Sequence, residues 1–256
     1  MSNWAALDAE LDAWAAAGRK ALFWWRDDDA GALTPELQRL LDLQAASAAP
    51  LSLAVIPASA GAELAQALRG RDSIAVLQHG FAHRNHAPAG EKKAEFPSVR
   101  PAQEALADLR QGRENLKKLF GIGLRPVLVP PWNRIAPALL PHLPRLGLHG
   151  LSTYKAREEA WAAPGLMQVN THLDPVDWRQ GAGFLGEAAC LDQALRQLRL
   201  ARDTPEAEPL GLLTHHAQQD EATWAFTARF IAHTQAHRAA LWVDIDTAFG
   251  AGPPPG

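Results

Sequence analysis

Three adjacent carboxylates, Asp27, Asp28 and Asp29, directly follow the apolar segment 20–26, KALFWWR. Neighbouring carboxylates repel one another, and burying them beside an apolar strand costs free energy unless a cation compensates their charge. A solvated turn or a helix cap is the alternative interpretation. Because the run follows three aromatic residues, full solvation is disfavoured, and a metal ion is the natural compensating charge.

Two histidines, His79 and His83, follow another apolar segment, 73–78. The spacing H-x-x-x-H brings both imidazoles to one side of a helical turn, within reach of one ion, although Gly80 allows a looser turn. Two surface histidines are the alternative. Imidazole and carboxylate ligands together suit zinc, and also cobalt, nickel or manganese. We therefore expect one divalent metal, zinc first among them.

A second pair of histidines, His215 and His216, directly follows the apolar segment 209–214. Histidine suits a proton donor or acceptor near neutral pH, and the sequence leaves open which of the two would act. A buried structural pair is the alternative. Asp174 or Asp177 could fix the tautomer of a catalytic imidazole and raise its pKa, or could form a cap and a turn.

The polar clusters follow apolar segments that alternate with amphipathic ones, which predicts a parallel sheet covered by helices. A barrel would gather the clusters at one rim, whereas an open doubly wound sheet is the alternative and lacks a Gly-rich phosphate loop here. Helices are expected within 1–20 and at 35–46, 60–68, 101–120, 136–146, 191–201 and 221–236, the one at 136–146 being interrupted by Pro141 and Pro144. Strands are expected at 20–26, 51–56, 73–78, 126–129, 150–153, 166–170, 209–213 and 240–245.

Length and composition fit one domain at 1–250, followed by a disordered tail at 251–256. The formal net charge is −3 and no Lys/Arg-rich run occurs, so we expect no nucleic-acid partner. No apolar stretch is long enough for a membrane span, and the acidic N-terminus is unlike a signal peptide. The lone Cys190 cannot form an internal disulfide. We expect a soluble, cytoplasmic protein; its oligomeric state is not predicted.

In this order, the motifs resemble those of the NodB-homology polysaccharide deacetylases, carbohydrate esterase family four. That family has T-F-D-D-G-like, H-[ST]-x-x-H, R-x-P-[YFW], D-x-x-D-W-like and L-x-H motifs. This sequence has RDDDAG at 26–31, HGFAH at 79–83, VPPW at 129–132, DPVDW at 174–178 and LTHH at 213–216. The resemblance covers about residues 20 to 216. It implies an α/β fold, a distorted (β/α) barrel of about seven strands, one divalent metal that is often zinc, and removal of acetyl groups from N-acetylated sugars.

The resemblance also implies a role for individual residues, position by position. Asp29, His79 and His83 match the metal ligands, and Asp28 matches the catalytic base. His215 matches the histidine that protonates the leaving amine, and Asp177 or Asp174 matches the carboxylate that tunes it. The resemblance implies substrate contacts at Trp132, Trp178 and Leu213. We add Arg134, which follows Trp132 closely in the chain.

Several positions depart from the family pattern. Asp27 replaces an apolar residue, Ala30 replaces glycine, and Gly80 replaces serine or threonine. Val129 stands where the family has an arginine that orients the base, and Arg26 or Arg134 could supply that charge from elsewhere. These departures predict a divergent branch of the family.

The resulting hypothesis is a metal-dependent hydrolase acting on carbon–nitrogen bonds other than peptide bonds. Its substrate would be a small molecule or an oligosaccharide: an N-acetylated sugar or a related amide, made inside the cell. A non-catalytic carbohydrate-binding relative is the alternative that Val129 favours. A phosphoester hydrolase is a third, with a phosphate site formed by Arg26, Arg84 and Arg134.

Overall fold

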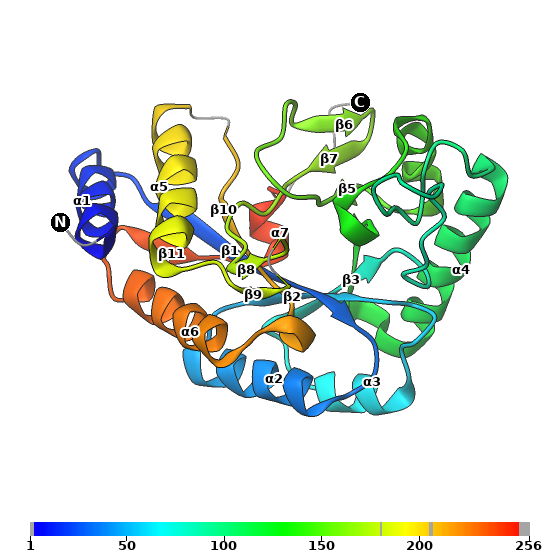
Figure 1. Ribbon diagram of the computed structural model, residues 1–256, viewed down its shortest axis with the longest axis horizontal. Coiled ribbons are helices and arrows are strands. Elements are labelled where there is room, and N and C mark those ends of the chain that lie inside the picture. The colour runs from blue at the N-terminus through cyan, green and yellow to red at the C-terminus, as the bar shows by residue number, and fades with distance from the viewer. Residues whose placement is uncertain (1–2, 180, 205–206, 251–256) are drawn as a thin grey trace.

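In the computed structural model, which describes residues 3–179, 181–204 and 207–250, a mainly parallel sheet forms the centre of the molecule (Figure 1). Its strand order is β10-β1-β2-β3-β4-β5-β7-β6, and β11 also pairs with β1. All neighbours are parallel except β6 and β7. The strands of this sheet are β1 (Ala21–Ala30), β2 (Leu51–Val55), β3 (Ile74–His79), β4 (Leu124–Val129), β5 (Gly150–Leu151), β6 (Trp161–Ala163), β7 (Leu166–Gln168), β10 (Leu210–Thr214) and β11 (Ala240–Trp242).

The chain beyond β7 brings the two ends of this sheet toward each other. Tyr154 bridges to Thr171 on the β5 side, and Leu173 bridges to Leu212 in β10. The Leu213 N–H donates to the Leu173 carbonyl at 2.8 Å. The regular strands do not form a closed barrel, but these bridges are compatible with the predicted distorted one. A separate two-stranded sheet of β8 (Val176–Asp177) and β9 (Gly183–Phe184) follows.

Helices cover the sheet, and amphipathic sequence accounts for their placement. In α2, Thr34 accepts a hydrogen bond from the Leu37 N–H as the N-cap, Pro35 begins the helix, and the buried face includes Leu40 and Leu41. α1 packs beside α5 at the edge of the molecule where α6 also lies (Figure 1). The helices are α1 (Asn3–Ala16), α2 (Pro35–Ser47), α3 (Ala62–Leu68), α4 (Ala102–Phe120), α5 (Glu187–Asp203), α6 (Glu221–Gln235) and α7 (Ile245–Ala248).

The structure differs from the sequence prediction in several elements. The helix expected at 136–146 is two short 3-10 helices, η3 (Pro137–His142) and η4 (Pro144–Leu146), because the prolines at 141 and 144 have no N–H to donate. β1 continues through all three aspartates to Ala30, and residues 245–248 form α7 where the last strand was expected to end. The strands β6, β8 and β9 were not predicted.

The tail at 251–256 lies outside the described residues, and the assignment of 1–250 to one domain stays a prediction. None of the helices in the described ranges has the length and apolar character that a bilayer crossing requires.

Candidate active site

A β-bulge at the carboxyl end of β1 determines where Asp29 lies. The register pairs Asp27 with Leu53 and Ala30 with Val55, so β1 has one residue more than β2 between these pairs. Asp29 has a φ of +70°, a left-handed conformation that aspartate adopts more readily than most residues. In a regular strand Asp29 would share a face with Asp27. The bulge removes this constraint, and Asp29 lines a cleft that Asp27 does not line.

Asp29, His79 and His83 form a cluster whose potential ligand atoms all lie within 4.8 Å of one another. Oδ1 of Asp29 is 2.9 Å from Nε2 of His79 and 3.1 Å from Nε2 of His83. Nδ1 of His79 lies 3.0 Å from the carbonyl oxygen of Val129, to which it donates, so in the neutral ring Nε2 is the unprotonated nitrogen. One carboxylate and two such imidazoles are a donor set that fits a divalent transition metal.

Within the cluster, the Asp29 carboxyl and the His79 ring both have shifted pKa values. Burial disfavours the charged form of Asp29, but hydrogen bonds from His79 and His83 hold the pKa of the Asp29 carboxyl well below its usual range. Burial alone would lower the pKa of His79, yet the hydrogen bond to Asp29 and the charges of Asp28 and Asp29 raise it above its ordinary value. Below this raised pKa, a cation that binds here displaces a proton from His79.

The loop that carries His83 is held by the buried carboxylate of Glu95, which is 1% exposed. Its two oxygens accept hydrogen bonds from the backbone N–H groups of Phe81 at 3.0 Å, Ala82 at 2.8 Å and Arg84 at 3.4 Å. His83 itself has a φ of +53°, an uncommon conformation that these bonds on both sides of it stabilise.

The position of Glu95 explains the glycine at position 80, where the resembled family has serine or threonine. Gly80 has a φ of +54°, and a Cβ there would lie 2.0 Å from Oε2 of Glu95 and 2.5 Å from Cδ of Pro131. A side chain at position 80 is therefore incompatible with the Glu95 carboxylate in its present place.

Asp28 forms an ion pair with Arg26, which is fully buried. Nε of Arg26 donates to Oδ1 at 2.8 Å and Nη2 donates to Oδ2 at 3.0 Å. The two residues are two positions apart in β1, so both side chains lie on one face of the strand. Arg26 also donates to Oγ of Ser152, the Thr153 carbonyl and Oδ1 of Asn133. Of the two arginines proposed to replace the one missing at Val129, the structure brings Arg26 to Asp28.

Asp27 and His216 form a separate buried pair away from the cleft. Nδ1 of His216 lies 2.5 Å from Oδ1 of Asp27, whose other oxygen accepts from Oγ1 of Thr214 at 2.7 Å. Burial would lower the pKa of His216, but the charge and hydrogen bond of Asp27 raise it. This pair ties β1 to the end of β10. Among the predicted alternatives, the structure therefore separates Asp28, Asp29 and His215, which line the cleft, from Asp27 and His216.

His215 lines the same cleft as Asp28 and lies beside Trp178 and Asp174. Its Nδ1 is 3.9 Å from Oδ2 of Asp174, and its ring meets the Trp178 indole edge-on with 4.7 Å between centroids. Asp174 accepts hydrogen bonds from Nε1 of Trp178 at 2.8 Å and from the Val176 N–H at 3.0 Å. Burial raises the pKa of the Asp174 carboxyl, although the charge of His215 acts against this shift.

Of the two aspartates proposed to tune His215, the structure brings Asp174 to it. The carboxylate of Asp177 instead accepts a hydrogen bond from the Arg179 N–H at 2.9 Å. Sequence spacing could not separate the two, because the arrangement depends on the turn that leads into β8.

The cleft has a volume of about 750 Å³. Of the predicted substrate contacts, Trp132, Trp178 and Arg134 line it; the Trp132 ring packs on His83 with 4.3 Å between centroids. Leu213 does not line the cleft as it stands: it pairs in register with Arg26 and is 1% exposed. Several further lining residues were not predicted: Lys93, Asn133, Tyr154, Lys155 and Gln218.

Comparison with known proteins shows what this fold is similar to. No protein-family model and no curated protein matches the sequence. Among solved structures, a CE4 esterase from Streptococcus mutans has a TM-score of 0.61 at 14% identity, over 93% of this chain and 90% of that one. The chitin deacetylase from Colletotrichum lindemuthianum has a TM-score of 0.57 at 15% identity, over 92% and 90%. A family 4 acetyl xylan esterase from Clostridium thermocellum, in complex with a cobalt ion, has a TM-score of 0.54 at 14% identity, over 89% and 90%.

The described chain therefore has the fold of the family 4 carbohydrate esterases, a class that includes deacetylases of polysaccharides. This confirms the predicted resemblance and the predicted α/β fold, and identities of 14% to 15% agree with a divergent member.

Proposed function

We propose that this chain is a metal-dependent hydrolase that removes an acetyl group from an N-acetylated sugar or a related amide. The observation that carries the proposal is the cluster of Asp29, His79 and His83 in a cleft also lined by Asp28 and His215. One cleft thus contains a metal donor set, a carboxylate held by an arginine, and a histidine beside a buried carboxylate. Metal-assisted amide hydrolysis can use these groups as Lewis acid, general base and general acid.

Zinc is the metal we propose, with cobalt, nickel and manganese as the other candidates for this donor set. A divalent cation held by Asp29, His79 and His83 would supply Lewis acidity toward an amide carbonyl and would lower the pKa of a water molecule. His79 is already oriented for this role by its hydrogen bond to the Val129 carbonyl.

In the proposed reaction Asp28 accepts a proton from the attacking water. The two hydrogen bonds from Arg26 fix the plane of the Asp28 carboxylate. His215 donates a proton to the amine nitrogen as the carbon–nitrogen bond breaks, and acetate and a free amine leave. Asp174 lies on the Nδ1 side of His215, which leaves Nε2 as the nitrogen available to the substrate.

Two other functions are less well supported. The argument for a non-catalytic sugar-binding relative was Val129 in place of an arginine, and the ion pair of Arg26 with Asp28 removes that argument. A phosphoester hydrolase would need Arg26 free to bind phosphate, but the buried Arg26 side chain already donates to Asp28, Ser152, Thr153 and Asn133. The cytoplasmic location stays a prediction.

The experiment that tests the proposal measures acetate release from a panel of N-acetylated sugars, together with the metal content of the protein. Asp28→Asn is expected to retain metal and lose turnover, whereas Asp29→Asn and His79→Gln are expected to lose both. His86→Gln is the matched control, because His86 is in the same loop region but does not line the cleft. Full metal content in Asp29→Asn, or no acetate from any amide with zinc or cobalt, would refute the proposal.

A further inference from the structure

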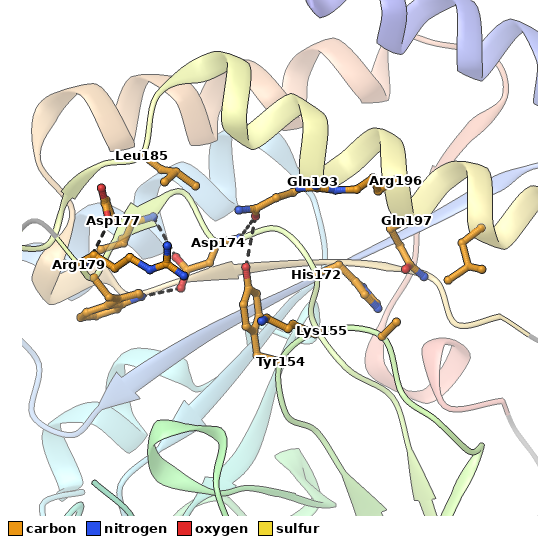
Figure 2. Close-up of a pocket in the computed structure, with 14 residues that line it drawn as sticks. Tyr154, Lys155, His172, Asp174, Asp177, Arg179, Leu185, Gln193, Arg196 and Gln197 are labelled. Carbon is orange, nitrogen blue, oxygen red and sulfur yellow. Dashed lines mark hydrogen bonds between the residues drawn. The ribbon is translucent and has the colours of Figure 1, made fainter. Parts of the chain in front are cut away.

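A second cleft, of about 700 Å³, shares part of its lining with the metal-site cleft. Four residues line both: Tyr154, Lys155, Asp174 and Trp178. In Figure 2, α5 forms one wall with Gln193 and Arg196, Tyr154 and Lys155 stand on the other side, and the Tyr154 hydroxyl donates to Oε1 of Gln193 at 3.3 Å. Because these residues belong to both clefts, a molecule with its reacting group at His215 that extends past Trp178 would meet the second cleft.

Three cations line the second cleft: Lys155, Arg179 and Arg196. None of their side chains has a hydrogen bond or an ion pair within the described residues. The two carboxylates of the lining already have donors, because Asp174 accepts from Trp178 and from a backbone N–H, and Asp177 accepts from the Arg179 N–H. The cleft thus has three cationic side chains that lack a protein partner.

This arrangement contrasts with the chain as a whole, whose formal net charge is −3. Elsewhere several arginines form ion pairs with carboxylates, among them Arg39 with Glu221, Arg125 with Asp246, and Arg229 with Glu187. The cleft lining has three cations, none of them paired in the part of the chain that the structure describes, against two carboxylates, and a local excess of positive charge in a cleft attracts anions.

An aromatic surface lies where the two clefts meet. Trp178 is 51% exposed, and its Nε1 donates to Asp174 at 2.8 Å, so the indole is fixed in place although its ring is open to solvent. A fixed, exposed indole is suited to packing against the apolar face of a sugar ring. The second cleft therefore combines a sugar-packing surface with cations at a distance from the metal site.

We propose that the second cleft is a subsite for an anionic group of the substrate, a phosphate or a carboxylate. The substrate class is then an acidic N-acetylated saccharide: its acetamide occupies the metal-site cleft, a sugar ring packs on Trp178, and its anion is attracted into the second cleft by the charges of Arg179, Arg196 and Lys155. The link to acetyl removal rests on the proposed function, but anion binding at the subsite does not.

The test is calorimetric titration at low ionic strength with three probes: N-acetylglucosamine, its 1-phosphate and N-acetylmuramic acid. Each titration is run on the protein as purified and after treatment with a chelator, so that an anion bound to a metal is recognised by its loss. The variants are Arg179→Gln and Arg196→Gln. Arg69→Gln is the matched control, because Arg69 is exposed at the end of α3 and lines neither cleft.

We expect the acidic probes to bind about tenfold more tightly than the neutral sugar, and each cleft variant to lose about fivefold of that affinity while the control loses none. The preference is expected to fall with added salt. The tighter of the two acidic probes identifies the anion as phosphate or carboxylate. Equal affinity for neutral and acidic probes, or an equal loss in Arg69→Gln, overturns the subsite.

The two proposals fail in different ways. Acidic probes that bind but never release acetate would overturn the proposed reaction and leave the subsite. Acetate release with the same kcat/KM from neutral and acidic sugars would overturn the subsite and leave the reaction.

Discussion

Arg26 and Asp28 form a fully buried ion pair within one strand, joined by two hydrogen bonds of 2.8 and 3.0 Å. The carboxylate lines the metal-site cleft, while the guanidinium lies behind it and is further bound by Ser152 and Asn133. Breaking a buried pair by removing one partner leaves an uncompensated charge, which is costlier than removing both. The pair therefore couples the proposed base to the stability of the fold.

We predict that Arg26→Met lowers the free energy of unfolding by about 3–5 kcal/mol, because the buried Asp28 side chain is left without its ion-pair partner. Adding Asp28→Asn to that variant removes the charge and is expected to recover part of the loss. Urea unfolding of both single variants and the double variant measures the coupling. Arg134→Met, which removes an arginine from the cleft wall, is the control, with an expected change within about 0.5 kcal/mol. Strictly additive losses would contradict the coupling.

Zinc affinity is predicted to rise with pH. The pKa of His79 in the fold is raised above its ordinary 6.5, so near neutral pH the incoming cation competes with a proton on that ring. Over the pH range in which binding displaces one proton, the apparent affinity for zinc rises about tenfold per pH unit. Competition with a chromophoric chelator at pH 6, 7 and 8 measures it. An affinity that does not change over this range would show that His79 binds no proton that the metal must displace.

The same shift predicts the pH dependence of the metal-free protein. A protonated His79 stabilises the fold in full below pH 6.5, and this contribution is lost as the pH rises through the raised pKa of His79. The Tm of chelator-treated protein is therefore expected to fall above neutral pH by more than that of His79→Gln, and zinc is expected to restore it. Calorimetric scans between pH 6 and 9 compare the two proteins.

The metal-site cluster could be predicted because its residue types stand in short motifs at strand ends. The pairing of Arg26 with Asp28 could also have been predicted, because the alternation of side chains along a strand puts both on one face. The bulge at Asp29 could not have been predicted, because it depends on the pairing of β1 with β2. The interruption of the segment 136–146 at its prolines was predicted, but the spacing of its leucines did not show that both pieces would be 3-10 and not α-helical.

Glu95 shows why sequence reasoning missed part of the site. It lies 14 residues from Phe81 and 13 from Ala82 along the chain, in a segment with no periodic pattern. Only the folded loop brings its carboxylate under those amides. The one local signal was Gly80 in place of serine or threonine, which indicates a close neighbour but does not say which residue it is.

We predict that Glu95→Gln weakens zinc binding through His83. An amide has one acceptor oxygen where the carboxylate has two, so part of the set of bonds to Phe81, Ala82 and Arg84 is lost and the loop loosens. The expected loss of zinc affinity is about 10-fold or more, as for other residues that orient metal ligands. Glu91→Gln, an exposed residue of the same segment, is the control. Unchanged affinity in Glu95→Gln would mean that His83 is positioned without Glu95.

Gly80→Ala is predicted to be more damaging than an ordinary glycine substitution. The new Cβ would meet Oε2 of Glu95 at 2.0 Å and Pro131 at 2.5 Å, and the φ of +54° is itself unfavourable for alanine. We expect a loss of more than about 1 kcal/mol in the free energy of unfolding, measured by urea unfolding. Gly90→Ala, with a φ of +85° and nothing within 4 Å of the new Cβ, isolates the effect of the backbone conformation. Equal losses in the two variants would exclude a role for the contact with Glu95.

The two aspartates before Trp178 are predicted to differ in their effect on catalysis. Asp174 lies 3.9 Å from Nδ1 of His215, whereas Asp177 accepts from the backbone of Arg179. Asp174→Asn removes the negative charge beside the proposed proton donor, so kcat is expected to fall about 100-fold or more, with KM little changed. Asp177→Asn is the matched control and is expected to retain kcat. If Asp177→Asn instead lowered kcat and Asp174→Asn did not, the carboxylate that acts on His215 would be Asp177.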